Sequence, residues 1–227
     1  MNIPKSLVLA SGSPRRAFLL KECGFQFSVK PTHAPEDFDE DMEVEVVPAF
    51  LATKKAQEAI LSAKPDELIL TADTVVIFNG TILNKPQSVQ EAVQMLGLLS
   101  GNTHKVITAV CLATPSNLET IEETSWVTFH DLRTADIEKY VHQYKPMDKA
   151  GAYGAQECLP ENYDPCSGHE RAFLQRLKNT TILQKSKPDP SDERPLIAIK
   201  EIAGSYFNVM GLPIVKIYDK LVALSKP

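Results

Sequence analysis

A β-hairpin signal in the first half of the chain constrains the fold more than any other feature of this sequence. Asn79-Gly80 lies between two runs of β-forming residues, 74–78 and 81–83. Asn-Gly is the pair that fits a two-residue type I′ turn, because both central positions of that turn need a positive φ. We therefore expect an antiparallel pair of strands here, with Asp73 and Lys85 at its open end.

Strand and helix signals alternate through the rest of the chain. Each expected strand is rich in β-forming residues, and each expected helix begins near a Ser, Thr or Pro. The expected strands are 6–10, 25–29, 67–72, 103–113, 120–129 and 196–202, and the expected helices are 14–23, 47–63, 88–99, 134–144 and 213–224. This alternation, together with the hairpin, predicts an α/β fold in which helices flank a mixed sheet.

Composition restricts the classes of protein to which this chain can belong. Apolar residues make up 43% of its 227 residues and charged residues 23%, which is ordinary for a folded domain. The net charge of −5 argues against a nucleic-acid partner, because the surface as a whole repels a phosphate backbone. The only early apolar run, Leu7 to Ala10, is too short for a signal peptide or a membrane span. Four cysteines without a CxxC pair fit a reducing compartment, so we expect a cytoplasmic protein with no membrane partner.

The segment after the first expected strand has the residues of a phosphate-binding site. Ser11 and Ser13 precede a helix that begins at Pro14, and Arg15 and Arg16 lie in its first turn. The backbone N–H groups of a helix's first turn point outward and carry partial positive charge. Guanidinium groups and hydroxyls beside them match the oxygens of a phosphate. The alternative is a capped surface helix with two solvated arginines.

Acidic residues form a second candidate site. Asp73 follows the apolar strand 67–72, and a carboxylate there can bind a metal ion or act as a general base toward water. Glu36 heads a run, residues 36–45, in which seven of ten residues are acidic. It can share a divalent cation with Asp73 and with substrate phosphates. The alternatives are a turn residue at a strand end and a solvated acidic loop.

A glycine-rich loop at residues 149–156 is a third candidate, although it lacks the spacing of a nucleotide-binding fingerprint. Gln156, at its end, can read the edge of a base, because a side-chain amide offers both a donor and an acceptor. The alternative is a loop that needs glycine only for its tight turns.

Residues 157–195 differ in composition from the rest of the chain. They contain five prolines and two of the four cysteines, so we expect a surface insertion with a short helix at about residues 170–178. Cys158, Cys166 and His169 suggest a partial zinc site, but a fourth ligand is missing. Unpaired thiols are the alternative.

Taken together, six stretches of this chain resemble, in order, the motifs of the Maf family of nucleoside triphosphate pyrophosphatases. They are residues 9–16, 72–76, 83–86, 100–108, 149–156 and 204–213. The resemblance covers nearly the whole chain apart from the 157–195 insertion.

The resemblance implies an elongated mixed sheet flanked by helices, the fold of inosine triphosphate pyrophosphatases (Maf/Ham1-type). It implies a single domain, residues 1–227, of two lobes with the active cleft between them, and a homodimer. The implied reaction is the hydrolysis of dTTP and UTP, and of modified pyrimidine nucleotides, to the monophosphate and pyrophosphate, with Mg²⁺ or Mn²⁺ as cofactor. Two alternatives stay open. One is the same chemistry on another base, such as 7-methyl-GTP, and the other is a non-catalytic regulator of cell division that inhibits septum formation.

The resemblance also implies roles for individual residues. Asp73 is the catalytic base and, with Glu36, a metal ligand, although Pro35 stands where the family usually has Asp. Of the adjacent lysines Lys54 and Lys55, the second is the better match to the family's lysine. The substrate-binding residues are Ser11, Ser13, Arg15, Arg16, Lys55, Thr74, Lys85 and Gln156, with Arg15, Thr74 and Gln156 as specificity positions. The basic residues of this set would offset the roughly four negative charges of a nucleoside triphosphate.

Overall fold

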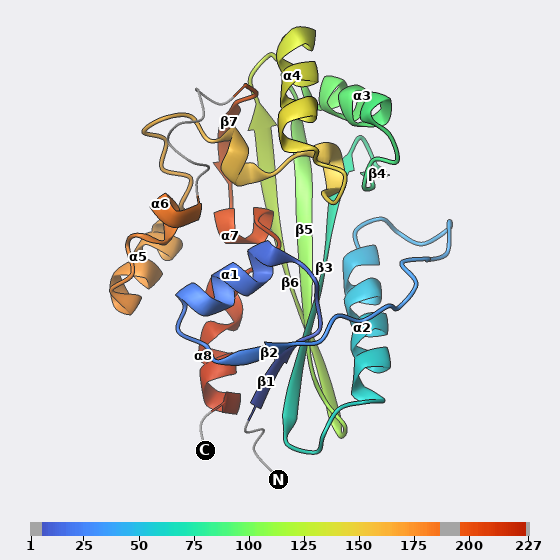
Figure 1. Ribbon diagram of the computed structural model, residues 1–227, viewed down its shortest axis with the longest axis vertical. Coiled ribbons are helices and arrows are strands. Elements are labelled where there is room, and N and C mark those ends of the chain that lie inside the picture. The colour runs from blue at the N-terminus through green and yellow to red at the C-terminus, as the bar shows by residue number, and fades with distance from the viewer. Residues whose placement is uncertain (1–5, 187–195, 226–227) are drawn as a thin grey trace. The chain divides into compact units, whose positions relative to one another are not determined.

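The computed structural model describes residues 6–186 and 196–225, and the chain divides into two compact units. Unit 1 comprises Met1–Thr74, Ile107–Glu123 and Gly211–Pro227, and unit 2 comprises Val75–Val106 and Thr124–Met210. Within the described residues, a seven-stranded sheet has the order β2-β1-β3-β5-β6-β7, with β4 paired to β3 (Figure 1). The mixed α/β fold predicted from the sequence is confirmed.

The helices and strands have the following bounds. The strands are β1 (Ser6–Leu9), β2 (Phe27–Val29), β3 (Glu67–Phe78), β4 (Thr81–Leu83), β5 (Thr103–Thr114), β6 (Asn117–Phe129) and β7 (Ile199–Ala203). The α-helices are α1 (Pro14–Glu22), α2 (Val47–Ile60), α3 (Val89–Leu99), α4 (Thr134–Tyr144), α5 (Gly168–Leu177), α6 (Ile182–Ser186), α7 (Tyr206–Val209) and α8 (Ile214–Ser225). Two short 3₁₀ segments, η1 (Ala150–Ala152) and η2 (Ala155–Cys158), shape the glycine-rich loop and its end.

The hairpin predicted from Asn79-Gly80 is present in unit 2. Phe78 pairs with Thr81, and the φ angles of Asn79 and Gly80 are 49° and 75°, as a type I′ turn requires. The pairing extends only to Val76 and Leu83. Lys85 therefore follows the end of β4.

The expected end of the third strand at residue 72 is wrong, because β3 runs without a break from Glu67 to Phe78. Asp73 lies in the middle of this strand and is only 7% exposed. Aspartate has a low β-propensity, which is why the sequence indicated a strand end at this position. The ion pair described below offsets that preference.

Small side chains in unit 1 let α2 pack closely on the sheet, where β1 pairs in parallel with both β2 and β3. The buried cluster consists of Val8, Ala10, Ala52, Ala56, Ile69, Ala109, Cys111 and Ala113. The hydroxyl of Thr71, on β3, donates to the carbonyl of Ala52, on α2, at 2.7 Å. This buried bond and the close packing fix α2 along β3, and so position every side chain that α2 carries.

Helix α1 begins and ends near the predicted residues. Ser13 is its N-cap and Pro14 its first residue, although the Ser13 side chain makes no capping hydrogen bond. After the helix, Gly24 adopts a φ of 84°, and its N–H bonds to the carbonyl of Lys21 at 2.9 Å. This is the left-handed C-terminal motif that glycine favours.

One expected helix boundary and two expected helix caps need correction. The spacing Ser88-x-x-Glu91 predicts a capping box at the start of α3. The side chain of Ser88 accepts the N–H of Glu91, but the Glu91 carboxylate accepts the N–H of Gln87, so the capping box is incomplete. Helix α2 ends at Ile60 and not at residue 63, because the N–H groups of residues 61–63 bond to carbonyls three positions back instead of four. Helix α4 has the expected bounds, Thr134–Tyr144, but its N-cap is Arg133 and not Thr134, the residue that the sequence indicates as the cap.

The segment that follows residue 157 contributes side chains to the interior of unit 2. The buried ones include Cys158, Leu159, Cys166, Phe173, Leu174 and Ile182. The expected short helix is confirmed as α5, and it begins with a capping box that the sequence reading missed, formed by Ser167 and Glu170. The Glu170 carboxylate also accepts bonds from Ser205 Oγ at 2.7 Å and from the N–H of Phe207 at 3.0 Å, which joins α5 to α7. Residues 187–195 lie outside the described residues.

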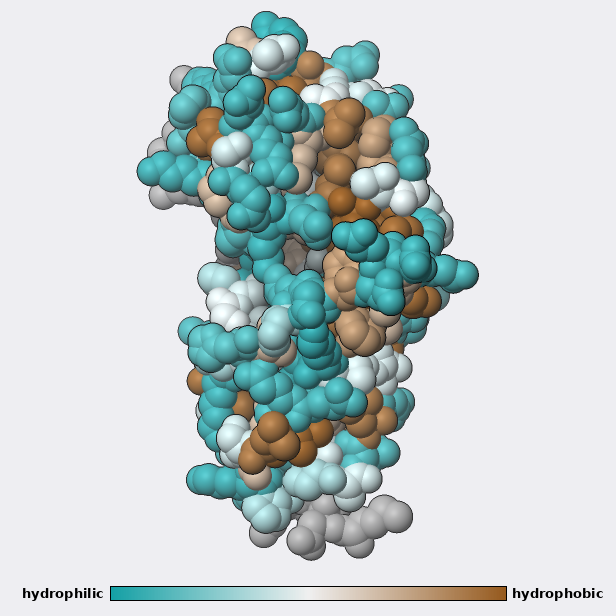
Figure 2. All heavy atoms as spheres, turned by 90° about the vertical axis from the view of Figure 1, so that its right-hand side faces the viewer, coloured by the Kyte–Doolittle hydropathy of each residue, from teal (hydrophilic) through white to brown (hydrophobic). Residues whose placement is uncertain are grey.

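The face of the molecule shown in Figure 2 is mostly hydrophilic, with apolar side chains in small groups. No helix in the described part of the chain is long and apolar enough to cross a bilayer. All four cysteines are free and buried. Burial raises the pKa of Cys23 to about 12 and the pKa values of Cys158 and Cys166 well above their ordinary value. These thiols are therefore protonated at neutral pH and are poor nucleophiles.

Candidate active site

Arg16, in the first turn of α1, is held by hydrogen bonds to three separate segments of unit 1. Its guanidinium donates to the carbonyl of Gly211 at 2.8 Å, to Ser11 Oγ at 3.0 Å and to Thr74 Oγ1 at 3.1 Å. Gly211 has a φ of 100°, which residues with a side chain rarely adopt. The guanidinium is therefore fixed in one orientation.

The charges around Arg16 interact with one another. Burial lowers the pKa of Arg16 to about 10, against the opposing influence of Asp73. The charge of Arg15 lowers the pKa of Arg16 further, and that of Glu36 raises it. Arg16 is therefore cationic at neutral pH, and its charge acts on both acidic residues of the site.

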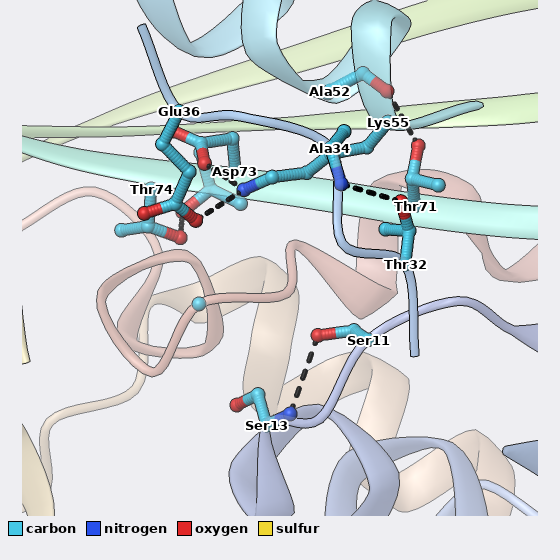
Figure 3. A network of polar contacts seen from close by, with 12 residues as sticks. Ser11, Ser13, Thr32, Ala34, Glu36, Ala52, Lys55, Thr71, Asp73 and Thr74 are labelled. Carbon is cyan, nitrogen blue, oxygen red and sulfur yellow. Dashed lines mark hydrogen bonds and ion pairs between the residues drawn. The ribbon is translucent and has the colours of Figure 1, made fainter. Parts of the chain in front are cut away.

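The two serines of the predicted phosphate site lie next to each other at the start of α1. Ser11 Oγ accepts the N–H of Ser13 at 3.3 Å (Figure 3). Both serines and Arg15 are partly exposed. Ser11, Ser13 and Arg16 are thus gathered at one helix N-terminus, as the sequence predicted, although the phosphate ligand stays a prediction.

Lys55, on α2, links the two acidic residues that the sequence singled out. Its Nζ lies 2.6 Å from Asp73 Oδ1 and 2.7 Å from Glu36 Oε1 (Figure 3). The side chains of Lys55 and Asp73 are 11% and 10% exposed, whereas that of Glu36 is 47% exposed. One ammonium and two carboxylates, from a helix, a strand and a loop, therefore meet in unit 1.

The neighbouring lysine makes a different and more exposed ion pair. Lys54 Nζ lies 2.6 Å from Asp37 Oδ1, and the Asp37 side chain is 77% exposed. The hydrogen bond from Lys54 lowers the pKa of Asp37. Of the two adjacent lysines, it is Lys55 that contacts Asp73.

Glu58, one turn after Lys55 on α2, holds the loop that follows β2. Its Oε2 accepts the hydroxyl of Thr32 at 2.5 Å, and its Oε1 accepts the N–H of His33 at 3.3 Å. Thr32 Oγ1 in turn accepts the N–H of Ala34 at 3.1 Å (Figure 3). Sequence reasoning missed Glu58, because its only signal is an i, i+3 spacing from a site lysine. The same helix thus supplies the site's ammonium and fixes the start of the acidic loop.

Two predicted site residues, Lys85 and Gln156, belong to unit 2. Lys85 is exposed, and its carbonyl accepts a bond from the side chain of Gln87 at 3.1 Å. Gln156 lies in η2, and its Oε1 is buried without a hydrogen-bond partner in the described part of the chain. The expected roles of both residues, and the expected cleft between lobes, stay predictions.

Comparison with known proteins identifies the family. The model of the Maf-like protein family matches residues 6–161. This chain belongs to the Maf-like family. A dTTP/UTP pyrophosphatase from Phocaeicola vulgatus is 36% identical to it, over 96% of this chain and 95% of the relative. Another dTTP/UTP pyrophosphatase, from Porphyromonas gingivalis, is 37% identical over 95% of this chain and 92% of the relative.

Solved structures similar to this Maf-like chain include two Ham1 proteins. The one from Staphylococcus aureus has a TM-score of 0.40 and 16% identity, covering 56% of this chain and 73% of the other. The one from Coxiella burnetii has a TM-score of 0.39 and 14% identity, covering 80% of this chain and 96% of the other.

The carboxylates of this Maf-like chain fit a divalent cation. Glu36 and Asp73 already converge on one cation, the ammonium of Lys55. Mg²⁺ is commonly held by one or two carboxylates, with substrate phosphates and waters as its other ligands. In the described ranges, no group of three or more His, Cys, Asp or Glu residues could hold a metal ion. The partial zinc site considered from Cys158, Cys166 and His169 is therefore not formed.

We expect Glu58→Ala to release the loop that follows β2 in this Maf-like protein. The variant loses both acceptors that hold Thr32 and His33, and hydrogen bonds to a charged group are among the stronger ones in proteins. Amide hydrogen exchange of residues 32–37 should become faster by about tenfold or more. Gln57→Ala, at the exposed neighbouring position of α2, is the matched control and should leave the exchange unchanged. Unchanged exchange in Glu58→Ala would show that other contacts hold the loop.

Proposed function

We propose that this chain hydrolyses dTTP and UTP to the nucleoside monophosphate and pyrophosphate. The observation that carries the proposal is the cluster in which Lys55 bridges Asp73 and Glu36, with the charge of the fixed Arg16 acting on both carboxylates. Relatives named dTTP/UTP pyrophosphatases match nearly the whole chain, which supports the same substrate class.

The cationic residues explain how a chain with a net charge of −5 can bind a polyanion. A nucleoside triphosphate carries roughly four negative charges near neutral pH, and fixed cations stabilise such charge far better than mobile solvent. Arg15, Arg16 and Lys55 supply that charge in unit 1, and Lys85 is proposed as a further phosphate ligand. Arg15, Thr74 and Gln156 are proposed to select the nucleotide.

In the proposed reaction, Asp73 acts as the general base. Its carboxylate takes a proton from a water molecule, and the water oxygen forms a bond to the α-phosphorus. The bond from the α-phosphorus to the oxygen that bridges to the β-phosphorus breaks, and pyrophosphate leaves with the bonding electrons. Lys55 orients the Asp73 carboxylate through the 2.6 Å contact. A divalent cation, Mg²⁺ or Mn²⁺, held by Glu36 and Asp73, would neutralise phosphate charge when bound.

A substrate panel tests this proposal. The purified protein is incubated with Mg²⁺ or Mn²⁺ and each of dTTP, UTP, dCTP, GTP and 7-methyl-GTP, and pyrophosphate release is measured. We expect the highest kcat/KM with dTTP and UTP. Similar rates on all purine nucleotides would overturn the pyrimidine assignment, and phosphate release without pyrophosphate would overturn the reaction itself.

The proposal also includes a homodimer and a cytoplasmic location. The homodimer follows from the family resemblance, and light scattering of the purified protein measures it directly. Four free, buried cysteines fit a reducing compartment.

A further inference from the structure

A buried polar network in unit 2, outside the cluster around Asp73, holds the residues that flank Gln156 in the chain. Its centre is the hydroxyl of Tyr140, on α4, whose side chain is fully buried. This hydroxyl donates to Glu157 Oε2 and accepts the N–H of Gly154 at 3.0 Å. One phenolic oxygen therefore ties α4 to the residues on both sides of the 155–156 turn.

Glu157 folds back over the glycine-rich loop. Its N–H donates to the carbonyl of Gly154 at 3.1 Å, and its Oε1 lies 3.7 Å from the Nζ of Lys149, a residue that is only 9% exposed. A Cβ at Gly154 would lie 2.7 to 2.9 Å from the Glu157 carboxylate, closer than real contacts allow. Glycine at this position is therefore what lets the carboxylate reach both Tyr140 and Lys149.

The hydrogen bond between Tyr140 and Glu157 persists at physiological pH. Burial raises the pKa of Tyr140 well above its ordinary value, and the neighbouring Cys158 and Glu157 raise it further. The phenol is therefore protonated and donates at any physiological pH. The carboxylate of Glu157 offers the matching acceptor, and a charged acceptor makes a stronger bond than a neutral one.

Gln156 lies between the two residues that this network holds. Its Oε1 is buried without a hydrogen-bond partner in the described residues. A buried acceptor without a donor is unfavourable. The acceptor would be satisfied by an N–H donor on a ligand. Uracil and thymine carry an N–H at ring position 3, whereas cytosine has an acceptor at that position.

We propose that Tyr140 and Glu157 are positioning residues that fix the Gln156 amide, and that they thereby set the preference for uracil and thymine over cytosine. The inference rests on the proposed function, because it assumes that Gln156 selects the nucleotide. Neither residue has to touch the substrate. The network acts by restricting the amide to one orientation before binding, which improves affinity for the base that matches it.

The test compares Tyr140→Phe with the parent protein. The substitution removes one oxygen and keeps the ring, so the fold should be retained, which circular dichroism and urea unfolding check. We expect kcat/KM for dTTP and UTP to fall by about tenfold, mainly through KM, while kcat/KM for dCTP changes little. The ratio of dTTP to dCTP activity therefore falls by about tenfold.

Two further variants separate positioning from general stability. Tyr144→Phe removes a hydroxyl one turn further along α4, where the rings of Tyr140 and Tyr144 lie 5.0 Å apart, and it should leave the ratio unchanged. Glu157→Gln keeps an acceptor for the Tyr140 hydroxyl and should retain more of the dTTP preference than Glu157→Ala. A Tyr140→Phe protein that is less stable but keeps the parent ratio would overturn the inference.

The two proposals fail in distinguishable ways. If the parent protein releases no pyrophosphate from dTTP or UTP, the proposed function is wrong. If the parent protein prefers dTTP and UTP but Tyr140→Phe has the same preference, the function stands and only the positioning role is wrong.

Discussion

Replacing Asp73 with Asn should lower kcat/KM for dTTP hydrolysis by about 10²- to 10⁴-fold, the range that general-base catalysis contributes. Asparagine has nearly the same shape as aspartate, and its amide oxygen can still accept a bond from Lys55, so the fold should be retained. The amide cannot accept a proton from water, so the loss should appear in kcat. Pyrophosphate release measures the activity, and urea unfolding measures the stability of the variant.

Asp37→Asn is the matched control for this variant. Asp37 and Asp73 each lie 2.6 Å from a lysine Nζ, and the two lysines are adjacent on α2. Asp37 is 77% exposed and belongs to the acidic loop, whereas the side chain of Asp73 is 10% exposed on β3. We expect the Asp37→Asn variant to have the same kcat/KM for dTTP hydrolysis as the parent protein. An Asp73→Asn protein with more than about a tenth of the parent turnover would remove Asp73 from the proposed chemistry.

Local sequence signals predicted much of the fold because they depend on the backbone alone. Asn79-Gly80 specifies a turn through the positive φ of its two residues, and the structure has that turn. Pro14 begins α1 and Gly24 follows its end for similar reasons, since proline is restricted to a helical φ and glycine tolerates a left-handed one. Such constraints act within a few residues and need no knowledge of the tertiary structure.

The features that the sequence did not predict depend on contacts between distant segments. Aspartate has a low β-propensity, and the ion pair of Asp73 with Lys55, 18 positions away along the chain, offsets that preference. Glu58 and Glu170 likewise act through partners on other segments, at the loop after β2 and at α7. No local pattern distinguishes Asp73 or Glu58 from a solvated acid, and the Ser-x-x-Glu spacing of Glu170 indicates its capping role but not its bonds to Ser205 and Phe207.

The site contains charged groups that are costly to bury. Lys55 and Asp73 are both about nine-tenths buried in their side chains, and transferring such groups from water has a large desolvation cost. Their mutual attraction offsets this cost only while both partners are present. The pair is therefore better explained by the charge that the proposed reaction needs than by a contribution to stability.

Replacing Lys55 with Met should both destabilise the protein and reduce its activity. Methionine fills a similar volume but leaves Asp73 as a buried carboxylate without its 2.6 Å partner. Removing one member of a buried ion pair costs on the order of 3 kcal/mol in the free energy of unfolding. Activity should fall by about 10²-fold or more, because the variant also loses a cation proposed to bind phosphate. Urea unfolding and pyrophosphate release measure the two effects.

Lys54→Met provides the control, and a double variant tests the cause. Lys54 pairs with an exposed carboxylate, so Lys54→Met should change the urea midpoint and the activity much less than Lys55→Met does. In Lys55→Met/Asp73→Asn the buried charge is absent, so the double variant should be more stable than Lys55→Met alone while having no more activity. If the double variant recovers stability but not activity, the ion pair serves the reaction and not the stability of the fold. If the double variant is as unstable as the sum of the two single variants, the residues do not interact, and the proposed orientation of Asp73 by Lys55 is wrong.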